Sequence, residues 1–135
     1  MYKILLATDG STNSFKAAEE ASKLAGALQA EVTVISVIKD IPVARMPAEI
    51  YKTIEDNTQS MLEKTRDFLK EKGIEAKILS YQGNPGNVIC EVAEEGSYNL
   101  IVMGSSGLGS IEELFLGSVS NKVVHCAKTS VLIVK

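Results

Sequence analysis

The sequence has few of the residues that build disulfide frameworks or metal clusters. It contains two cysteines, Cys90 and Cys126, and a single histidine, His125. Two cysteines make neither a disulfide framework nor a zinc set, and both lie in segments with apolar periodicity, so we interpret them as two buried thiols. Because no nucleophile pattern lies near His125, we expect this residue to have a structural role near the end of a helix.

The sequence also lacks a positive charge excess, aromatic residues and long hydrophobic runs. The 14 basic and 17 acidic residues give a net charge of −3, which argues against binding to a nucleic-acid backbone. There is no tryptophan, and only 5% of the residues are aromatic. This argues against a flavodoxin, which uses aromatic rings to flank its flavin. The first apolar run meets Asp9 far short of a signal peptide or a membrane span. We therefore expect a cytoplasmic protein with no membrane contact.

The length and the apolar content indicate one folded domain. The chain has 135 residues, of which 45% are hydrophobic, and one hydrophobic core typically serves about 100–200 residues. We therefore expect residues 1–135 to form a single domain.

Short apolar runs rich in β-branched residues and leucine predict five strands, and stretches with helical spacing separate them. The predicted strands are residues 3–7, 32–38, 76–81, 100–103 and 131–134, and the predicted helices are residues 48–72, 85–95 and 118–127, preceded by one that follows Asn13 or Ser14 as N-cap and buries Phe15, Ala18, Ala21, Leu24, Ala25 and Leu28. Strict alternation of strand and helix predicts an α/β fold: an open, doubly wound parallel sheet with helices on both faces. The connection 39–47, which holds two of the three prolines, is expected to be a surface loop or a cover over a ligand.

Ligands bind such sheets beyond the carboxyl ends of the strands, which directs attention to the segment after the fourth strand. There, Gly104, Gly107, Gly117 and Ser118 follow the spacing Gly-x₂-Gly-x₉-Gly-Ser. Glycines let a backbone approach a ligand closely, and the helix that starts at Ser118 offers N–H donors suited to phosphate. The motifs of P-loop and dinucleotide-binding proteins are absent from the sequence.

This spacing resembles the nucleotide-binding signature of the universal stress protein family. The resemblance extends over nearly the whole chain, from the start at Lys3 to Ser11 through the glycine loop to the last strand between Val131 and Val134. It implies a five-stranded sheet of order 3-2-1-4-5 that binds ATP, with Mg²⁺ as the expected metal, across the ends of strands one, two and four. It also implies a homodimer that pairs through the last strand.

The resemblance assigns roles to individual residues. Gly104, Gly107, Gly117 and Ser118 match the loop that contacts ribose and phosphates. Asp9 matches an acidic position near the ribose and the metal, although the same residue could instead organise a turn with Gly10. The full set of predicted nucleotide-binding residues is Ala7, Thr8, Asp9, Val37, Met103, Gly104, Ser105, Gly107, Gly117, Ser118, Val119 and Ser120.

Three functions remain open at this stage. The first is an ATP-binding regulator of the stress response, and the second is a weak ATPase or phosphotransferase, for which the motif supplies no arginine. The third is a dimeric scaffold that binds no nucleotide. Ser106 favours this third alternative because many nucleotide-binding members have a cation there, and Glu112 and Glu113 favour it because their charge opposes a triphosphate.

Overall fold

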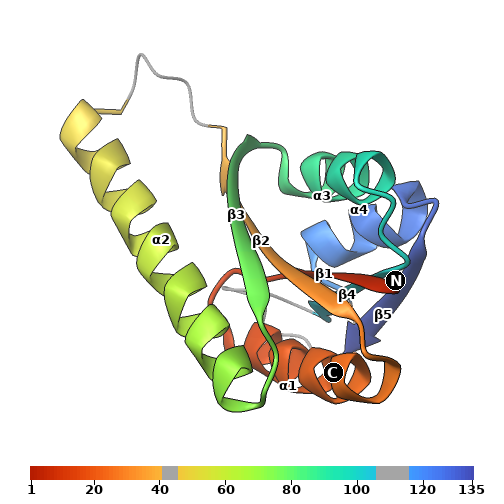
Figure 1. The fold of residues 1–135 in the computed structure, drawn as a ribbon. Helices are drawn as coiled ribbons and strands as arrows, with labels where there is room; N and C mark the ends of the chain where they lie inside the picture. The colour runs from red at the N-terminus through yellow and green to blue at the C-terminus, as the bar shows by residue number, and fades with distance from the viewer. Residues whose placement is uncertain (41–45, 106–115) are drawn as a thin grey trace.

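Five parallel strands form one sheet in the computed structural model, which describes residues 1–40, 46–105 and 116–135. The sheet order is β3-β2-β1-β4-β5, and every neighbouring pair is parallel (Figure 1). The predicted fold class and strand order are therefore confirmed. The strands are β1 (Lys3–Ala7), β2 (Glu31–Lys39), β3 (Ala76–Gly83), β4 (Leu100–Gly104) and β5 (Ser130–Val134).

Helices cover both faces of this sheet. They are α1 (Thr12–Leu28), α2 (Ala48–Glu71), α3 (Pro85–Glu95) and α4 (Ser118–Cys126). Helices α1 and α2 lie on one face and α3 and α4 on the other (Figure 1). Alternate residues of β1 serve the two cores, with Ile4 and Leu6 on the α1 side and Leu5 and Ala7 on the α3 side. Because both faces of β1 are buried, this central strand has no polar face, as expected for a parallel sheet, whereas the edge strand β3 has exposed polar residues such as Lys77 and Gln82.

The start of α1 differs from the prediction. Ser11 is the N-cap, and its side chain accepts a hydrogen bond from the backbone N–H of Ser14 at 3.2 Å. Asn13 and Ser14 lie inside the helix. The turn after β1 needs only Thr8, Asp9 and Gly10, which has a φ of +82°, so the helix can begin earlier than the periodicity indicated.

The buried face of α1 is also different from the predicted stripe. Its buried residues are small, and Phe15 and Leu28 are instead 42% and 47% exposed. A Cβ atom on Gly104 of β4 would lie 2.9 Å from the backbone carbon of Asn13, so this helix approaches the sheet closely. Only small side chains fit such an approach. The buried residues of α1 are Ser14, Ala17, Ala18, Ala21 and Ala25.

The prediction of two buried thiols is wrong. Cys90 of α3 and Cys126 of α4 form a disulfide, with their Cα atoms 6.4 Å apart. Both residues are partly exposed. Both cysteines lie in segments with apolar periodicity, but this periodicity could not show that the two helices meet at these positions, 36 residues apart in the chain.

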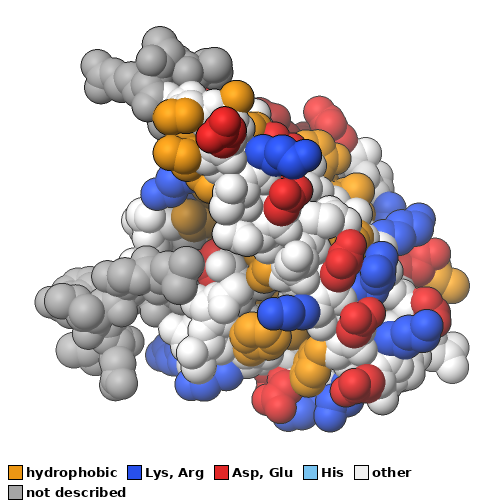
Figure 2. Space-filling view, turned by 90° about the vertical axis from the view of Figure 1, so that its left-hand side faces the viewer, with side chains coloured by type: hydrophobic (Ala, Val, Ile, Leu, Met, Phe, Trp, Pro, Cys, Tyr) orange, Lys and Arg blue, Asp and Glu red, His pale blue; other side chains and the backbone are white. Residues whose placement is uncertain are grey.

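Acidic and basic side chains are intermixed on the face shown in Figure 2, and the described residues form no large patch of one charge there. Among the described residues, the helices are too short or too polar to cross a membrane.

Candidate functional site

A cavity of about 630 Å³ lies beyond the carboxyl ends of β1, β2 and β4. This is the position at which doubly wound sheets bind ligands, and the volume is within the range of small-molecule sites. Of the predicted residues, Ser105 is absent from the cavity lining, and Gly107 lies outside the described residues. The other predicted residues do line it, namely Ala7, Thr8, Asp9, Val37, Met103, Gly104, Gly117, Ser118, Val119 and Ser120.

One part of the lining is apolar. Ile35 and Val37 of β2, Met103 of β4 and Ile89 of α3 contribute to it. All four belong to the core on the α3 side of the sheet, so this part of the cavity is continuous with the hydrophobic core. This part suits a flat apolar group such as a nucleobase.

The turn between β1 and α1 contributes a polar part. The Thr8 hydroxyl is 3.0 Å from that of Ser14, which donates to the Ser11 carbonyl at 2.8 Å. Asp9 accepts a hydrogen bond from the Ser11 N–H at 2.9 Å, so this carboxylate organises the turn and also lines the cavity. The two roles weighed for Asp9 are thus compatible in this geometry.

The first turn of α4 contributes the other polar part. Gly117 is the N-cap and has no side chain to satisfy the helix N–H groups that follow it. The N–H groups of Ser118, Val119 and Ser120 have no intrahelical partner by helix geometry, and the helix dipole adds a partial positive charge at this end. This turn can therefore hold an anion.

Ser105 and Ser120 position this turn against β4. The Ser105 carbonyl accepts from the Gly117 N–H at 2.7 Å and from the Ser120 hydroxyl at 2.8 Å. These bonds join the end of β4 to the start of α4. Because its hydroxyl is engaged there and its side chain is buried, Ser120 acts on the site mainly by holding the helix in place.

Lys39 supplies a cation that the motif does not contain. Among the described residues of the lining, only Asp9 and Lys39 carry a charge. Lys39 ends β2 two residues after Val37, so both side chains point to the same face of the sheet. That spacing is the signal that could have identified Lys39 from the sequence. The lining also includes Ser11, Ser14, Ile35, Pro85, Ile89 and Leu116, none of which was predicted.

The side chains of the site could hold a metal ion only together with a bound ligand that supplies further metal-coordinating atoms. The described residues contain no group of three His, Cys, Asp or Glu side chains placed to hold a metal ion. Mg²⁺ commonly takes one or two carboxylates together with phosphate oxygens and water. Asp9 can supply one such carboxylate, so the residues present fit a magnesium ion brought by a nucleotide.

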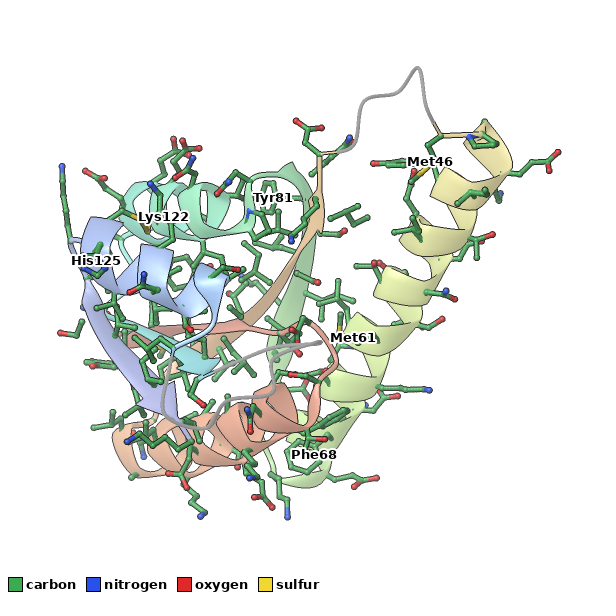
Figure 3. The ribbon with its side chains drawn as sticks, turned by 180° about the vertical axis from the view of Figure 1, so that it is seen from behind. Met46, Met61, Phe68, Tyr81, Lys122 and His125 are labelled. Carbon is green, nitrogen blue, oxygen red and sulfur yellow. A yellow bond between two sulfur atoms is a disulfide. The ribbon has the colours of Figure 1, made fainter. Side chains whose placement is uncertain are left out.

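Several other predicted features lie away from the cavity or outside the described residues. The His125 ring Nδ1 is 2.8 Å from the carbonyl oxygen of Asn121 within α4, in agreement with its predicted structural role. Lys122 and His125 project from α4 in Figure 3. Ser106, Glu112 and Glu113, together with most of the 39–47 connection, fall outside the residues that the structure describes.

An open parallel sheet with a cavity and a helix start beyond its strands defines a protein of the doubly wound class, whose members bind ligands at this position. The sequence model of a protein family, described as "Universal stress protein family", matches residues 1–135 of this chain. The chain belongs to the universal stress protein family.

Individual relatives agree with this assignment. Universal stress protein MJ0531 of Methanocaldococcus jannaschii is 36% identical over 138 residues, which cover 98% of this chain and 81% of that protein. The solved structure of hypothetical protein MJ0577 from the same organism superimposes with a TM-score of 0.88 at 27% identity and covers 99% of this chain and 95% of its own. A universal stress protein in complex with cAMP has a TM-score of 0.80 at 27% identity, with coverages of 99% and 97%.

Proposed function

We propose that this chain is an ATP-binding regulator of the stress response. In this proposal, residues 1–135 form one nucleotide-binding domain that holds ATP with Mg²⁺ and acts as a homodimer whose conformation or partners depend on occupancy. The observation that carries it is a single cavity that joins an apolar end, a carboxylate and a helix N-terminus. A nucleotide needs these three environments for its base, its ribose and its phosphates.

Each part of the nucleotide has a matching part of the cavity. The base would lie against Val37 and Ile89, and the ribose hydroxyls would donate to Asp9. The phosphates would accept hydrogen bonds from the first N–H groups of α4 at Ser118 and Val119. Mg²⁺, when bound, would neutralise phosphate charge, with Asp9 as its protein ligand.

A relative supports the nucleotide class without choosing between nucleotides. The universal stress protein in complex with cAMP shares this fold, and cAMP has the adenine and ribose of ATP but a single cyclic phosphate. In this proposal, contacts of the phosphates with the first turn of α4 therefore determine whether ATP or cAMP binds more tightly. A titration should compare ATP and cAMP directly.

The first prediction concerns Ser118, which is exposed at the first position of α4. We expect the wild-type protein to bind ATP with Mg²⁺ at a dissociation constant at or below about 10 μM, or roughly −7 kcal/mol. Ser118→Asp places a negative charge beside the phosphates and should weaken binding by about tenfold or more. The same change favours the helix dipole, so the protein should remain folded. Isothermal titration calorimetry measures the affinity.

Asn57→Asp is the matched control, because it adds the same charge on an exposed position of α2. It should leave the affinity unchanged. Gly117→Val, which puts a branched side chain at the N-cap, should reduce ATP binding as well. Wild-type affinity in both Ser118→Asp and Gly117→Val would contradict the assignment of this site, and no binding up to millimolar ATP would favour the scaffold that binds no nucleotide.

A weak ATPase is the second candidate, and Lys39 is the observation that favours it. Phosphoryl transfer needs positive charge near the departing phosphoryl group and an oriented water. Lys39 and Asp9 are a cation and a carboxylate in one cavity. Turnover faster than about one per minute that is lost in Asp9→Asn would establish hydrolysis.

The cytoplasmic location expected from the sequence remains a prediction.

A further inference from the structure

The disulfide lies between the two helices that form one wall of the cavity. Cys90 directly follows Ile89 of α3, and Ile89 lines the cavity. Cys126 ends α4, whose first turn from Ser118 lines the cavity at the opposite end of the helix. Both cysteines are partly exposed, so this helix contact lies at the protein surface and not in the closed core.

Close packing brings the two helices together at this bond. A Cβ atom on Gly86 of α3 would lie 2.8 Å from the Cβ of Lys122 of α4, so the helices touch where Gly86 has no side chain. The Cys126 Sγ is 3.8 Å from the Gly86 carbonyl, and the Cys90 Sγ is 3.9 Å from the Val123 carbonyl. The pair therefore lies inside a helix contact and is not attached to a loose loop.

The bonds to Ser105 hold the first turn of α4, whereas the rest of the helix has a short buried face. Helix α4 is 9 residues long, and its buried residues are Ser120 and Val123. Isolated helices of this length are marginal in water, so packing and cross-links determine how well the helix stays formed. A covalent bond in its last turn fixes α4 to α3, and this bond also limits how far the first turn can move.

We propose that Cys90 and Cys126 form a thiol–disulfide redox site, and that its state sets the affinity of the cavity for nucleotide. The second half of this proposal rests on the proposed function. The reactant class is a dithiol, either small or carried by a protein. With the disulfide closed, the first-turn N–H groups of α4 are held in place for phosphate. With it open, ordering the helix adds a cost to binding.

The exchange balances as a two-electron reaction. One thiolate of the dithiol attacks a sulfur of the Cys90–Cys126 bond, forms a mixed disulfide and releases the other cysteine as a thiolate, which takes up a proton. The second thiol of the reductant then displaces the remaining protein sulfur. The protein gains two electrons and two protons, and the reductant becomes a disulfide. Glutathione disulfide re-forms the Cys90–Cys126 bond by the same exchange and is itself reduced to two molecules of glutathione.

The first experiment counts thiols in the whole protein. Protein treated with glutathione disulfide, then denatured and alkylated, should carry no alkyl group by mass spectrometry. Protein treated with dithiothreitol should carry two. Cys126→Ser, which cannot close the bond, should retain a cysteine that reacts after either treatment, as an alkyl group or as a mixed disulfide with glutathione. Two alkylated cysteines in the oxidised wild-type protein would overturn the redox site.

The second experiment compares the two states in binding. Reduced protein should bind ATP with Mg²⁺ at least about fivefold more weakly than oxidised protein, which is the lower end of typical coupling between sites. The variant with both Cys90→Ala and Cys126→Ala should match the reduced protein under both treatments. Equal affinity of the oxidised and reduced wild-type protein would overturn the coupling while leaving the proposed function intact.

Hydrogen exchange separates failure of this proposal from failure of the proposed function. If neither state binds nucleotide, the proposed function fails, and exchange in residues 118–126 still tests whether the state of the disulfide affects α4. Reduction should speed exchange of these amides relative to those of α1, because local opening of α4 becomes easier. Identical exchange of α4 in both states would overturn the proposal.

Discussion

Gly104 shows how one residue can serve packing and a site together. The sequence motif assigned it to ligand contact, and it does line the cavity. An added Cβ atom would also lie 2.9 Å from the Cβ of Asn13 and 3.0 Å from its carbonyl oxygen. A backbone atom cannot move aside as a flexible side chain can. The absence of a side chain at Gly104 is therefore required by the contact between β4 and α1 even without a ligand.

The prediction from this contact is made on ligand-free protein. Gly104→Ala should lower the free energy of unfolding by about 1–3 kcal/mol, the usual cost of overpacking. Gly26→Ala is the matched control, because a Cβ atom there would meet nothing within 4 Å. It should raise the stability by about 0.4–1 kcal/mol. Urea denaturation measures both, and a neutral Gly104→Ala would show that α1 can move away from β4.

At the scale of elements, α2 has two halves with different surroundings. It runs for 24 residues, yet its buried residues are Leu62, Thr65 and Leu69, all in the second half. The first half slants away from β3 (Figure 1), although its Tyr51 reaches Gln82 of that strand by a hydrogen bond from the hydroxyl, and Ile50 is 50% exposed there. Met61 lies where the two halves meet, toward the turn after β1 (Figure 3), and a Cβ on Gly10 would be 3.2 Å from its side chain.

The two halves should respond differently to the same kind of truncation. Leu62→Ala removes a side chain that is 0% exposed and should cost about 2–5 kcal/mol of unfolding free energy. Ile50→Ala should change stability by less than about 0.5 kcal/mol, as for other surface positions. Urea denaturation again gives both values. A large effect at Ile50 would mean that this half of α2 packs against something in solution.

The sequence predicted elements better than it predicted what lies between them. Strands and helices follow from local periodicity, so the sheet and its cavity edge could be derived from residues a few positions apart. The N-cap at Ser11 and the cation at Lys39 were missed although their signals are local, whereas the bond between Cys90 and Cys126 depends on a contact between segments 36 residues apart. Lys39 could have been found by its spacing from Val37, whereas nothing in one sequence pairs the two cysteines.

At the scale of the whole molecule, the open edge of β5 is the feature with a consequence for assembly. In the described sheet, β5 is the edge strand beside β4. Its residues Val131 and Val134 are only partly buried, and an apolar edge strand favours pairing with another chain. Pairing with the same strand of a second copy would give a two-fold interface.

We expect light scattering at micromolar concentration to give about twice the monomer mass of 14.5 kDa. Val134→Lys places a charge on the edge strand, which is a common way to prevent edge pairing, and should shift the protein toward the monomer. Circular dichroism establishes that the variant is folded. A monomeric wild-type protein would contradict the proposed homodimer.

The position of β1 in the centre of the sheet affects how the chain can fold during synthesis. Its neighbour β2 follows soon after it, but its other neighbour is β4, and the Lys3 N–H donates to Asn99 across 96 positions. A ribosome must therefore release most of the chain before the first strand has both partners. Such distant pairings slow folding, so the nascent half-sheet would present an unpaired, apolar β1 edge to chaperones until residue 104 emerges.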